Sequence, residues 1–220
     1  MTDDRKSSTK KLSVLVSGGG TNLQAIIDEI DAGMIPNVEI CQVIASNKGA
    51  YAIQRAEKKG IPVSVISRKT FSDSKAYDAA MLAALQEYHT DIVVTAGFLS
   101  LLGHEVLAAY PNRIINIHPS LIPSFCGKGM YGIKPHEAAL QKGVKVSGAT
   151  VHFLTEQYDE GPIILQKAIP VLEDDTPESL QIRIMETCEQ KILPEAIRLV
   201  AGEKIRIQGN ITRNCTEITC

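Results

Sequence analysis

Residues 12–30 read LSVLVSGGGTNLQAIIDEI and combine an apolar run, a glycine-rich loop and a helical pattern. The run at 12–16 is rich in leucine and valine, which is typical of a buried parallel strand. Leu23, Ile26 and Ile30 then recur at the spacing of one helix face. A strand that leads through glycines into a helix presents free backbone N–H groups to an anion. The pattern therefore predicts a phosphate-binding turn.

The residues of this loop indicate which anion it binds. A P-loop requires a lysine after its last glycine, and none follows here, which argues against an NTPase. Gly18 and Gly20 meet half of the dinucleotide fingerprint, but Leu23 occupies the third glycine position. The next strand-like run ends in Ser46 rather than in an acidic residue that would bind a ribose diol. A single phosphate on a small substrate fits better than NAD. An NAD- or nucleotide-binding Rossmann module is the alternative from another class.

Strand-like and helical patterns alternate along the first half of the chain. Strand-like runs occur at 62–66, 91–95 and 114–118. A helical pattern at 51–59 precedes the first run, and another at 73–88 lies between the first and the second. This alternation is typical of an open, mostly parallel twisted sheet with helices on both faces, a Rossmann-like α/β fold. Ligands of such sheets bind beyond the carboxyl ends of the strands, where the glycine loop also lies.

The second half of the chain has a different pattern. Strand-like runs at 147–154 and 163–172 are joined by an acidic loop, which predicts a pair of antiparallel strands. A helix is expected to begin near Pro177, and Pro194 should bend it or restart it. The segment after Glu203 is expected to add one edge strand.

We expect one domain over residues 12–206. Residues 1–11 are polar and mixed in charge, and they are predicted to form a disordered tail. Residues 207–220 are predicted to form a second tail. No internal repeat, low-complexity tract or linker interrupts the domain.

Composition limits the classes of function. The net charge of −2 over 220 residues gives no general attraction to nucleic acid or to an anionic membrane. No apolar run reaches the roughly 20 residues that span a bilayer, and the polar start does not have the pattern of a signal peptide. Five scattered cysteines are expected to be reduced, so we expect a cytoplasmic protein. The histidines show no metal-binding spacing, and no metal is expected.

Two polar residues stand at the end of the strand-like run 114–118. Asn116 and His118 are two positions apart, so their side chains point to the same side of an extended strand. An amide and an imidazole there can hold a small carbonyl group, which suggests acyl transfer. A lone histidine after an apolar strand is more often structural, and Asp159, ahead of Gly161, has the position of a turn former. The role of Asp159 does not follow from spacing alone.

Four segments resemble the folate-dependent formyltransferase family. They read SGGGTNLQ at 17–24, AGFL at 96–99, NIHPSLIP at 116–123 and DEGPI at 159–163. The resemblance covers about residues 12–206. The Asn-x-His-Pro-Ser block with a later Asp-x-Gly-Pro is specific to folate-dependent formyl transfer. The glycine loop resembles that of the branch acting on glycinamide ribonucleotide.

The resemblance implies roles for particular residues of this chain. Asn116, His118 and Asp159 match the catalytic trio, and Glu189 matches a carboxylate that holds the glycinamide end of the substrate. The loop that binds the ribonucleotide phosphate matches Gly20, Thr21 and Asn22. The folate pocket matches Leu99, Ser100, Leu101, Leu102, Asn116, Thr155, Glu156, Gln157, Tyr158 and Asp159. Without the resemblance, Glu189 would be read as a solvated helix residue and the leucines as ordinary core.

The implied reaction transfers a formyl group from 10-formyltetrahydrofolate to the amine of N1-(5-phosphoribosyl)glycinamide in purine biosynthesis. It needs no metal, and its partners are these small molecules rather than nucleic acid or membrane. The protein is expected to be a monomer or a homodimer. Ser100 and Ser74 stand where some members carry arginine, with Lys75 as a substitute, so the contacts to the folate's glutamate tail stay open.

Two relatives with the same core are rivals. A formyltetrahydrofolate deformylase uses water as the acceptor and carries an extra N-terminal domain, for which the residues before the first strand leave no room. Methionyl-tRNA formyltransferase needs a basic RNA-binding extension, and this chain is too short and too acidic for one.

Overall fold

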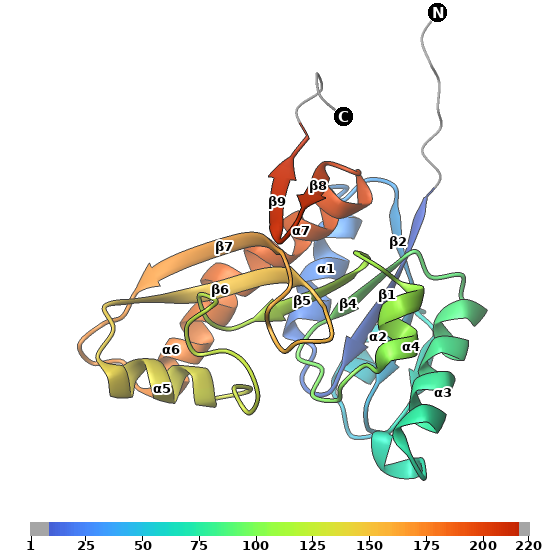
Figure 1. Cartoon of the computed structure of the whole chain (residues 1–220), viewed down its shortest axis with the longest axis horizontal. Helices are drawn as coiled ribbons and strands as arrows, with labels where there is room; N and C mark the ends of the chain where they lie inside the picture. Colours follow the sequence, from blue (N-terminus) through green and yellow to red (C-terminus); the bar gives the residue numbers. More distant parts are fainter. Residues whose placement is uncertain (1–8, 216–220) are drawn as a thin grey trace, which may run out of the picture.

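One nine-stranded sheet runs through the computed structural model, which describes residues 9–215 (Figure 1). Its strand order is β3-β2-β1-β4-β5-β6-β7-β9-β8. The first five strands in this order are mutually parallel. They are β3 (Val63–Val65), β2 (Val38–Ala45), β1 (Lys10–Val16), β4 (Ile92–Thr95) and β5 (Ile114–His118).

The other side of the sheet is antiparallel. β6 (Val146–Phe153) pairs antiparallel with both β5 and β7 (Ile163–Pro170). β8 (Ile205–Gln208) and β9 (Ile211–Asn214) form a hairpin that meets β7 through the single pair Ile163 and Ile211. The predicted mostly parallel sheet with antiparallel strands in the C-terminal half is confirmed.

The ends of the described chain differ from the expected boundaries. β1 begins at Lys10 rather than at residue 12. After Glu203, one edge strand followed by a tail was expected. Instead, the hairpin extends ordered strands to Asn214, and its residues Ile205 and Ile207 pack against the core. The rest of the predicted tails, residues 1–8 and 216–220, lies outside the described residues. The division into one domain and two tails stays a prediction.

Helices cover both faces of the sheet, because successive strand residues point to opposite sides. Val14 of β1 packs in the core under α1 (Thr21–Asp31), α2 (Ala52–Lys58), α6 (Pro177–Ile184) and α7 (Gln190–Ala201). Its neighbour Leu15 packs in the core under α3 (Ser74–Glu87) and α4 (His104–Ala109). α5 (Lys134–Lys142) lies beside α6, below the long β6–β7 pair (Figure 1).

The helix that follows β7 is interrupted earlier than expected. Thr176 caps α6 by accepting a hydrogen bond from the N–H of Ser179, and Pro177 occupies the first turn, as the sequence predicts. A π-helical turn, Met185–Glu189, then separates α6 from α7, and Pro194 lies inside α7. Proline has no N–H to bond the carbonyl one turn upstream. Pro194 was therefore expected to break the helix, but the break lies at the π-helical turn Met185–Glu189, and α7 continues through Pro194.

The sheet order reverses between β1 and β4, which creates a crevice at their carboxyl ends. The described helices include none that is long and apolar enough to cross a membrane. Cys41, Cys126 and Cys188 are free thiols. Cys215 is disulfide-bonded, so the expectation of reduced cysteines is wrong for this residue.

Helix α5 buries a histidine completely. Neither ring nitrogen of His136 has a hydrogen-bond partner among the described residues. Burial, together with the nearby His118, lowers the pKa of His136 to about 4. The folded protein therefore holds this ring neutral.

His136 should make the free energy of unfolding depend on pH. Because its pKa is about 4 when folded and about 6.5 when unfolded, its stabilising effect is complete above pH 6.5 and is lost as the pH falls towards 4. We expect this loss to reach about 3 kcal/mol. Urea unfolding between pH 7 and 4 should show it in the natural protein but not in His136→Leu. The exposed His104→Leu should keep it. Equal losses in the natural protein and His136→Leu would contradict this account.

Candidate active site

A cleft of about 580 Å³ opens at the carboxyl ends of β1, β4 and β5. Its size is ordinary for a small-molecule site. The glycine loop, the segment after β4, the end of β5, the 155–159 loop and the π-helical turn all contribute to its walls. It is lined by every residue selected from the sequence, namely Gly20, Thr21, Asn22, Leu99, Ser100, Leu101, Leu102, Asn116, His118, Thr155, Glu156, Gln157, Tyr158, Asp159 and Glu189.

The glycine loop turns its carbonyl groups away from the cleft. The carbonyl of Gly18 accepts from the N–H of Ala52 at 3.1 Å, and that of Gly19 accepts from Nε of Arg55 at 2.8 Å. The carbonyl of Gly20 accepts from the N–H of Gln24 inside α1. Backbone groups left over at such a turn bind anions. α2 therefore holds the loop from outside through these carbonyl groups, an arrangement suited to an anion at the loop's N–H groups.

Gly20 is required at its position for two reasons. Its φ of 71° lies in the left-handed region, which favours glycine. In addition, a Cβ on Gly20 would lie 2.6 Å from Cβ of Ala52.

Asn22 and Glu189 are joined at the next position along the cleft. Nδ2 of Asn22 donates to Oε2 of Glu189 at 2.7 Å, and both side chains are buried. Burial raises the pKa of Glu189, and the hydrogen bond from Asn22 offsets only part of this effect. Glu189 is the last residue of the π-helical turn, which presents it to the cleft instead of to solvent.

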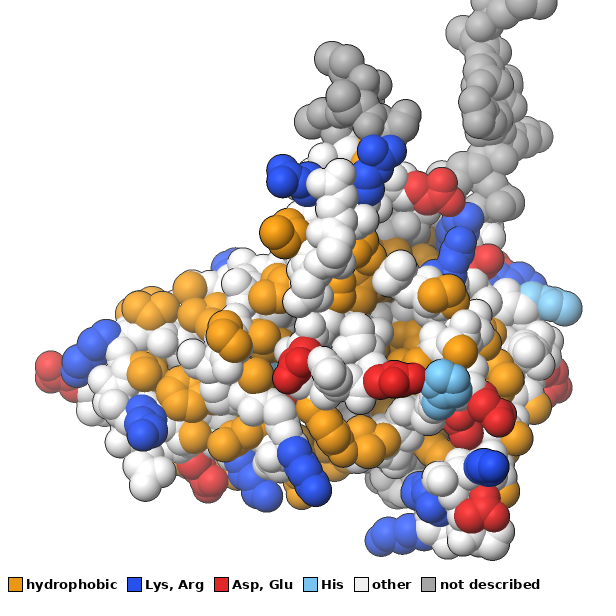
Figure 2. All heavy atoms as spheres, viewed as in Figure 1, with side chains coloured by type: hydrophobic (Ala, Val, Ile, Leu, Met, Phe, Trp, Pro, Cys, Tyr) orange, Lys and Arg blue, Asp and Glu red, His pale blue; other side chains and the backbone are white. Residues whose placement is uncertain are grey.

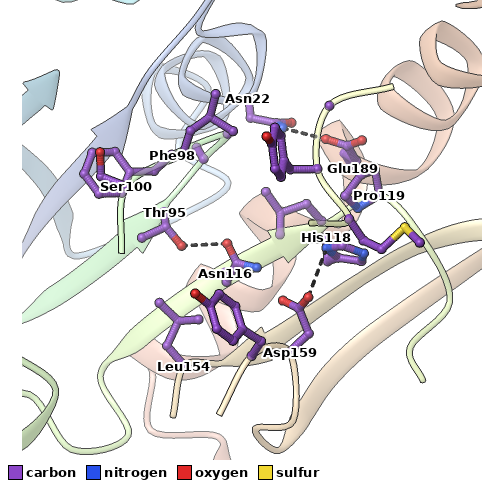
Figure 3. A pocket seen from close by; sticks show the side chains of 18 of the residues that line it. Asn22, Thr95, Phe98, Ser100, Asn116, His118, Pro119, Leu154, Asp159 and Glu189 are labelled. Atoms are coloured by element: carbon purple, nitrogen blue, oxygen red, sulfur yellow. Dashed lines mark hydrogen bonds and ion pairs between the residues drawn. The ribbon is translucent and has the colours of Figure 1, made fainter. Parts of the chain in front are cut away.

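His118 lies in the floor of the cleft. Its Nε2 is 3.0 Å from the carbonyl oxygen of Phe125, which can only accept, so this nitrogen carries a proton. Its Nδ1 faces Oδ2 of Asp159 at 3.7 Å (Figure 3). Burial lowers the pKa of His118, and Phe125 and Asp159 offset only part of this effect. The site therefore favours the neutral imidazole.

Asp159 reaches the site from the loop between β6 and β7. Its backbone adopts a φ of 55°, a conformation that aspartate tolerates better than most residues. Its Oδ2 accepts from the N–H of Gly127 at 2.7 Å, and its Oδ1 lies 3.6 Å from Nε2 of His152. Burial acts to raise the pKa of Asp159, but His152, His118 and Gly127 together hold it below its usual range. The carboxylate is therefore ionised beside the imidazole.

Asn116 is held by two residues that the sequence did not single out for the site. Thr95 donates to its Oδ1 at 2.7 Å, and Nε2 of His152 lies 3.1 Å from its Nδ2. Both neighbours are buried strand residues, so they were indistinguishable from core. Only the strand pairing of the structure reveals their role, because His152 pairs opposite Asn116 and Thr95 pairs with it on the other side.

An apolar wall completes the cleft. Leu99 and Leu101 are 63% and 61% exposed, although large aliphatic side chains normally pack inside. Tyr158 faces the same cleft, and His104 and Glu156 pair at its side. Hydrophobic side chains are exposed between charged groups on the face drawn in Figure 2. Clustered exposed apolar groups mark a binding surface for an apolar ligand.

No group of three or more histidine, cysteine or acidic side chains suited to a metal ion occurs within residues 9–215. The cleft instead joins an anion-binding turn, an amide–imidazole–carboxylate cluster and an apolar wall (Figure 3).

Comparisons with known proteins agree with this arrangement. The family model described as formyl transferase matches residues 10–197. The chain belongs to the formyl transferase family. A glycinamide ribonucleotide transformylase 1 structure from Symbiobacterium toebii is 44% identical, with a TM-score of 0.89, covering 94% of this chain and 95% of that one. The phosphoribosylglycinamide formyltransferase of Haemophilus influenzae is 37% identical over 92% of each chain.

Some relatives in the formyl transferase family are much longer. The trifunctional purine biosynthetic protein adenosine-3 of Bos taurus is 42% identical over 91% of this chain, but the chain spans only 19% of that protein.

Replacing Gly20 should destabilise the protein more than its positive φ alone would cause, because an added Cβ would also contact Ala52. Gly20→Ala combines a left-handed backbone with the contact to Ala52, and we expect it to lower the free energy of unfolding by about 2–3 kcal/mol. Gly33→Ala is the matched control, because Gly33 has a φ of 73° and nothing within 4 Å of its added Cβ. It should cost about 1 kcal/mol. Only Gly20→Ala should also weaken binding of inorganic phosphate, measured by calorimetry. Equal stability losses and unchanged phosphate binding would argue against this role for the loop.

Proposed function

We propose that this chain transfers the formyl group of 10-formyltetrahydrofolate to the amine of N1-(5-phosphoribosyl)glycinamide, a step of purine biosynthesis. The convergence of Asn116, His118 and Asp159 between an anion-binding turn and an apolar wall carries the proposal. The names of two similar proteins, which this chain covers over 92% and 95% of their length, support it. The donor acts as a co-substrate, and no metal takes part.

The two ends of the cleft suit two substrates. The ribonucleotide phosphate binds the N–H groups of Gly20, Thr21 and Asn22. Glu189, which accepts a hydrogen bond from Asn22, holds the glycinamide end of the same substrate. The pteridine of the folate lies against Leu99, Leu101 and Leu102 and the 155–159 loop. Binding both substrates makes the encounter of amine and formyl carbon intramolecular, which can contribute about 7–11 kcal/mol towards the barrier.

The chemistry begins with attack of the neutral amine on the formyl carbon. The carbonyl oxygen becomes an oxyanion, which an N–H of Asn116 stabilises. Neutral His118 accepts the amine proton on Nδ1, because its Nε2 proton is held by Phe125. His118 then delivers the proton to the folate nitrogen as the carbon–nitrogen bond to the folate breaks. The products are formylated ribonucleotide and tetrahydrofolate.

Asp159 acts on the charged intermediate rather than on the resting enzyme. Burial lowers the pKa of His118 despite the nearby charge of Asp159. The ionised carboxylate instead stabilises the imidazolium that forms once the amine proton is transferred.

The cytoplasmic location and the monomeric or dimeric state stay predictions.

A single assay tests the reaction. The protein is mixed with 10-formyltetrahydrofolate, with and without glycinamide ribonucleotide, and donor loss and formylated product are measured. We expect donor loss only with the ribonucleotide, matched by product. Donor loss without it would mean hydrolysis, the deformylase alternative. NAD binding without any donor loss would favour the nucleotide-binding module.

Asp159→Asn should change the pH dependence in a defined direction. The negative charge of Asp159 raises the pKa of His118, so its removal lowers that pKa further below the ordinary value. Because His118 must be neutral to accept a proton, the acid limb of kcat/KM should move to lower pH while kcat falls. Profiles measured between pH 5 and 8 should show this shift. The exposed neighbour Glu160→Gln should keep the natural profile. An acid limb that moves to higher pH would exclude this role.

A further inference from the structure

Three strands place polar side chains in one row beneath the cleft. Thr95 of β4 pairs with Asn116 of β5, and Asn116 pairs with His152 of β6. Residues paired across adjacent strands project from the same face of a sheet. Thr95 and His152 are 3% and 0% exposed, so the row is closed to solvent on both sides of Asn116. Figure 3 shows Thr95 directed at the Asn116 amide.

The direction of each hydrogen bond follows from one carbonyl group. The carbonyl oxygen of Phe153 can only accept, and it lies 2.9 Å from Nδ1 of His152, which therefore carries the proton. In the tautomer with that proton on Nδ1, Nε2 accepts from Nδ2 of Asn116 at 3.1 Å, and the carboxylate of Asp159, 3.6 Å from Nε2, lies beyond hydrogen-bond distance. The amide oxygen of Asn116 is left facing Thr95, whose hydroxyl donates to it at 2.7 Å.

We propose that the hydroxyl group of Thr95 is a positioning group for formyl transfer. It fixes the Asn116 amide so that an N–H, and not the carbonyl oxygen, faces the developing oxyanion. This inference rests on the proposed function, because it assigns Asn116 the oxyanion. Without the hydroxyl, the half-buried amide oxygen would lose its donor. Rotation of the amide would then bring an acceptor towards the negative oxygen.

A purely structural role for Thr95 makes different predictions. Its hydroxyl also lies 3.3 Å from the carbonyl of Ile115, so it could simply satisfy a strand. In that case its loss would lower stability without a specific effect on turnover. A positioning role instead lowers kcat and leaves the KM for the ribonucleotide unchanged, because the phosphate binds elsewhere in the cleft.

The test compares Thr95→Val, which keeps the shape and removes the hydroxyl, with Thr95→Ser, which keeps the hydroxyl. We expect Thr95→Val to lower kcat about 10-fold, less than the roughly 100- to 1000-fold loss typical of removing an oxyanion donor, as in Asn116→Ala. Thr95→Ser should retain most of the turnover. Thr212→Val is the matched control, because its hydroxyl donates to Ile163 at the hairpin, and it should keep the natural kcat.

A double-mutant cycle separates the two roles. In an Asn116→Ala background, Thr95→Val should lower kcat by less than twofold, since there is no amide left to position. The proposal is overturned if Thr95→Val keeps the natural kcat, if Thr95→Ser falls as far as Thr95→Val, or if the cycle is additive.

A readout independent of turnover covers a poorly folding variant or a failed activity assay. In ¹⁵N NMR spectra of the Thr95→Ser and natural proteins, the Asn116 side-chain amide should show slow hydrogen exchange, and Thr95→Val or Thr95→Ala should accelerate it. Unchanged exchange refutes the positioning contact itself. If exchange changes as expected but the natural protein transfers no formyl group, the proposed function fails and the contact stands.

Discussion

A slip of one residue between β5 and either neighbour would turn Asn116 and His118 to the opposite face of the sheet. The pairing of β4, β5 and β6 therefore determines whether Asn116 and His118 face the cleft. Parallel pairing on one side and antiparallel pairing on the other bring three chain segments to the same row. The core side chains fix this register, because Ile115 and Ile117 alternate with the polar pair and are buried.

Burial acts on each ionisable group of the cleft in a different way. It lowers the pKa of His118 and raises that of Glu189, since both charged forms lose hydration. Asp159 stays ionised because surrounding donors and the two histidines outweigh its own burial. The site thus places one charge beside one neutral base. This difference suits a reaction that moves a single proton from an amine to a departing nitrogen.

The sequence indicates the parts of the site that depend on local pattern. The strand–glycine–helix order and the spacing of Asn116 and His118 are local, and both were visible in the sequence. Asp159 was found only through a family resemblance, because its contact with His118 depends on a distant loop and on Gly127. Thr95 and His152 resemble core residues, since their polar atoms face Asn116 rather than solvent. The π-helical turn that presents Glu189 has no recognisable sequence signal.

The hairpin β8–β9 pairs with β7 at one residue pair only, and no other strand in the described part of the chain pairs with that edge of β7. Most of this edge is therefore open. An open strand edge is a template on which a foreign strand can add and start aggregation. Lys167 and Pro170 stand exposed on this strand. A charge there must be desolvated and a proline offers no N–H, so both discourage such growth. The reactive half of the sheet is thereby attached to an edge that resists polymerisation.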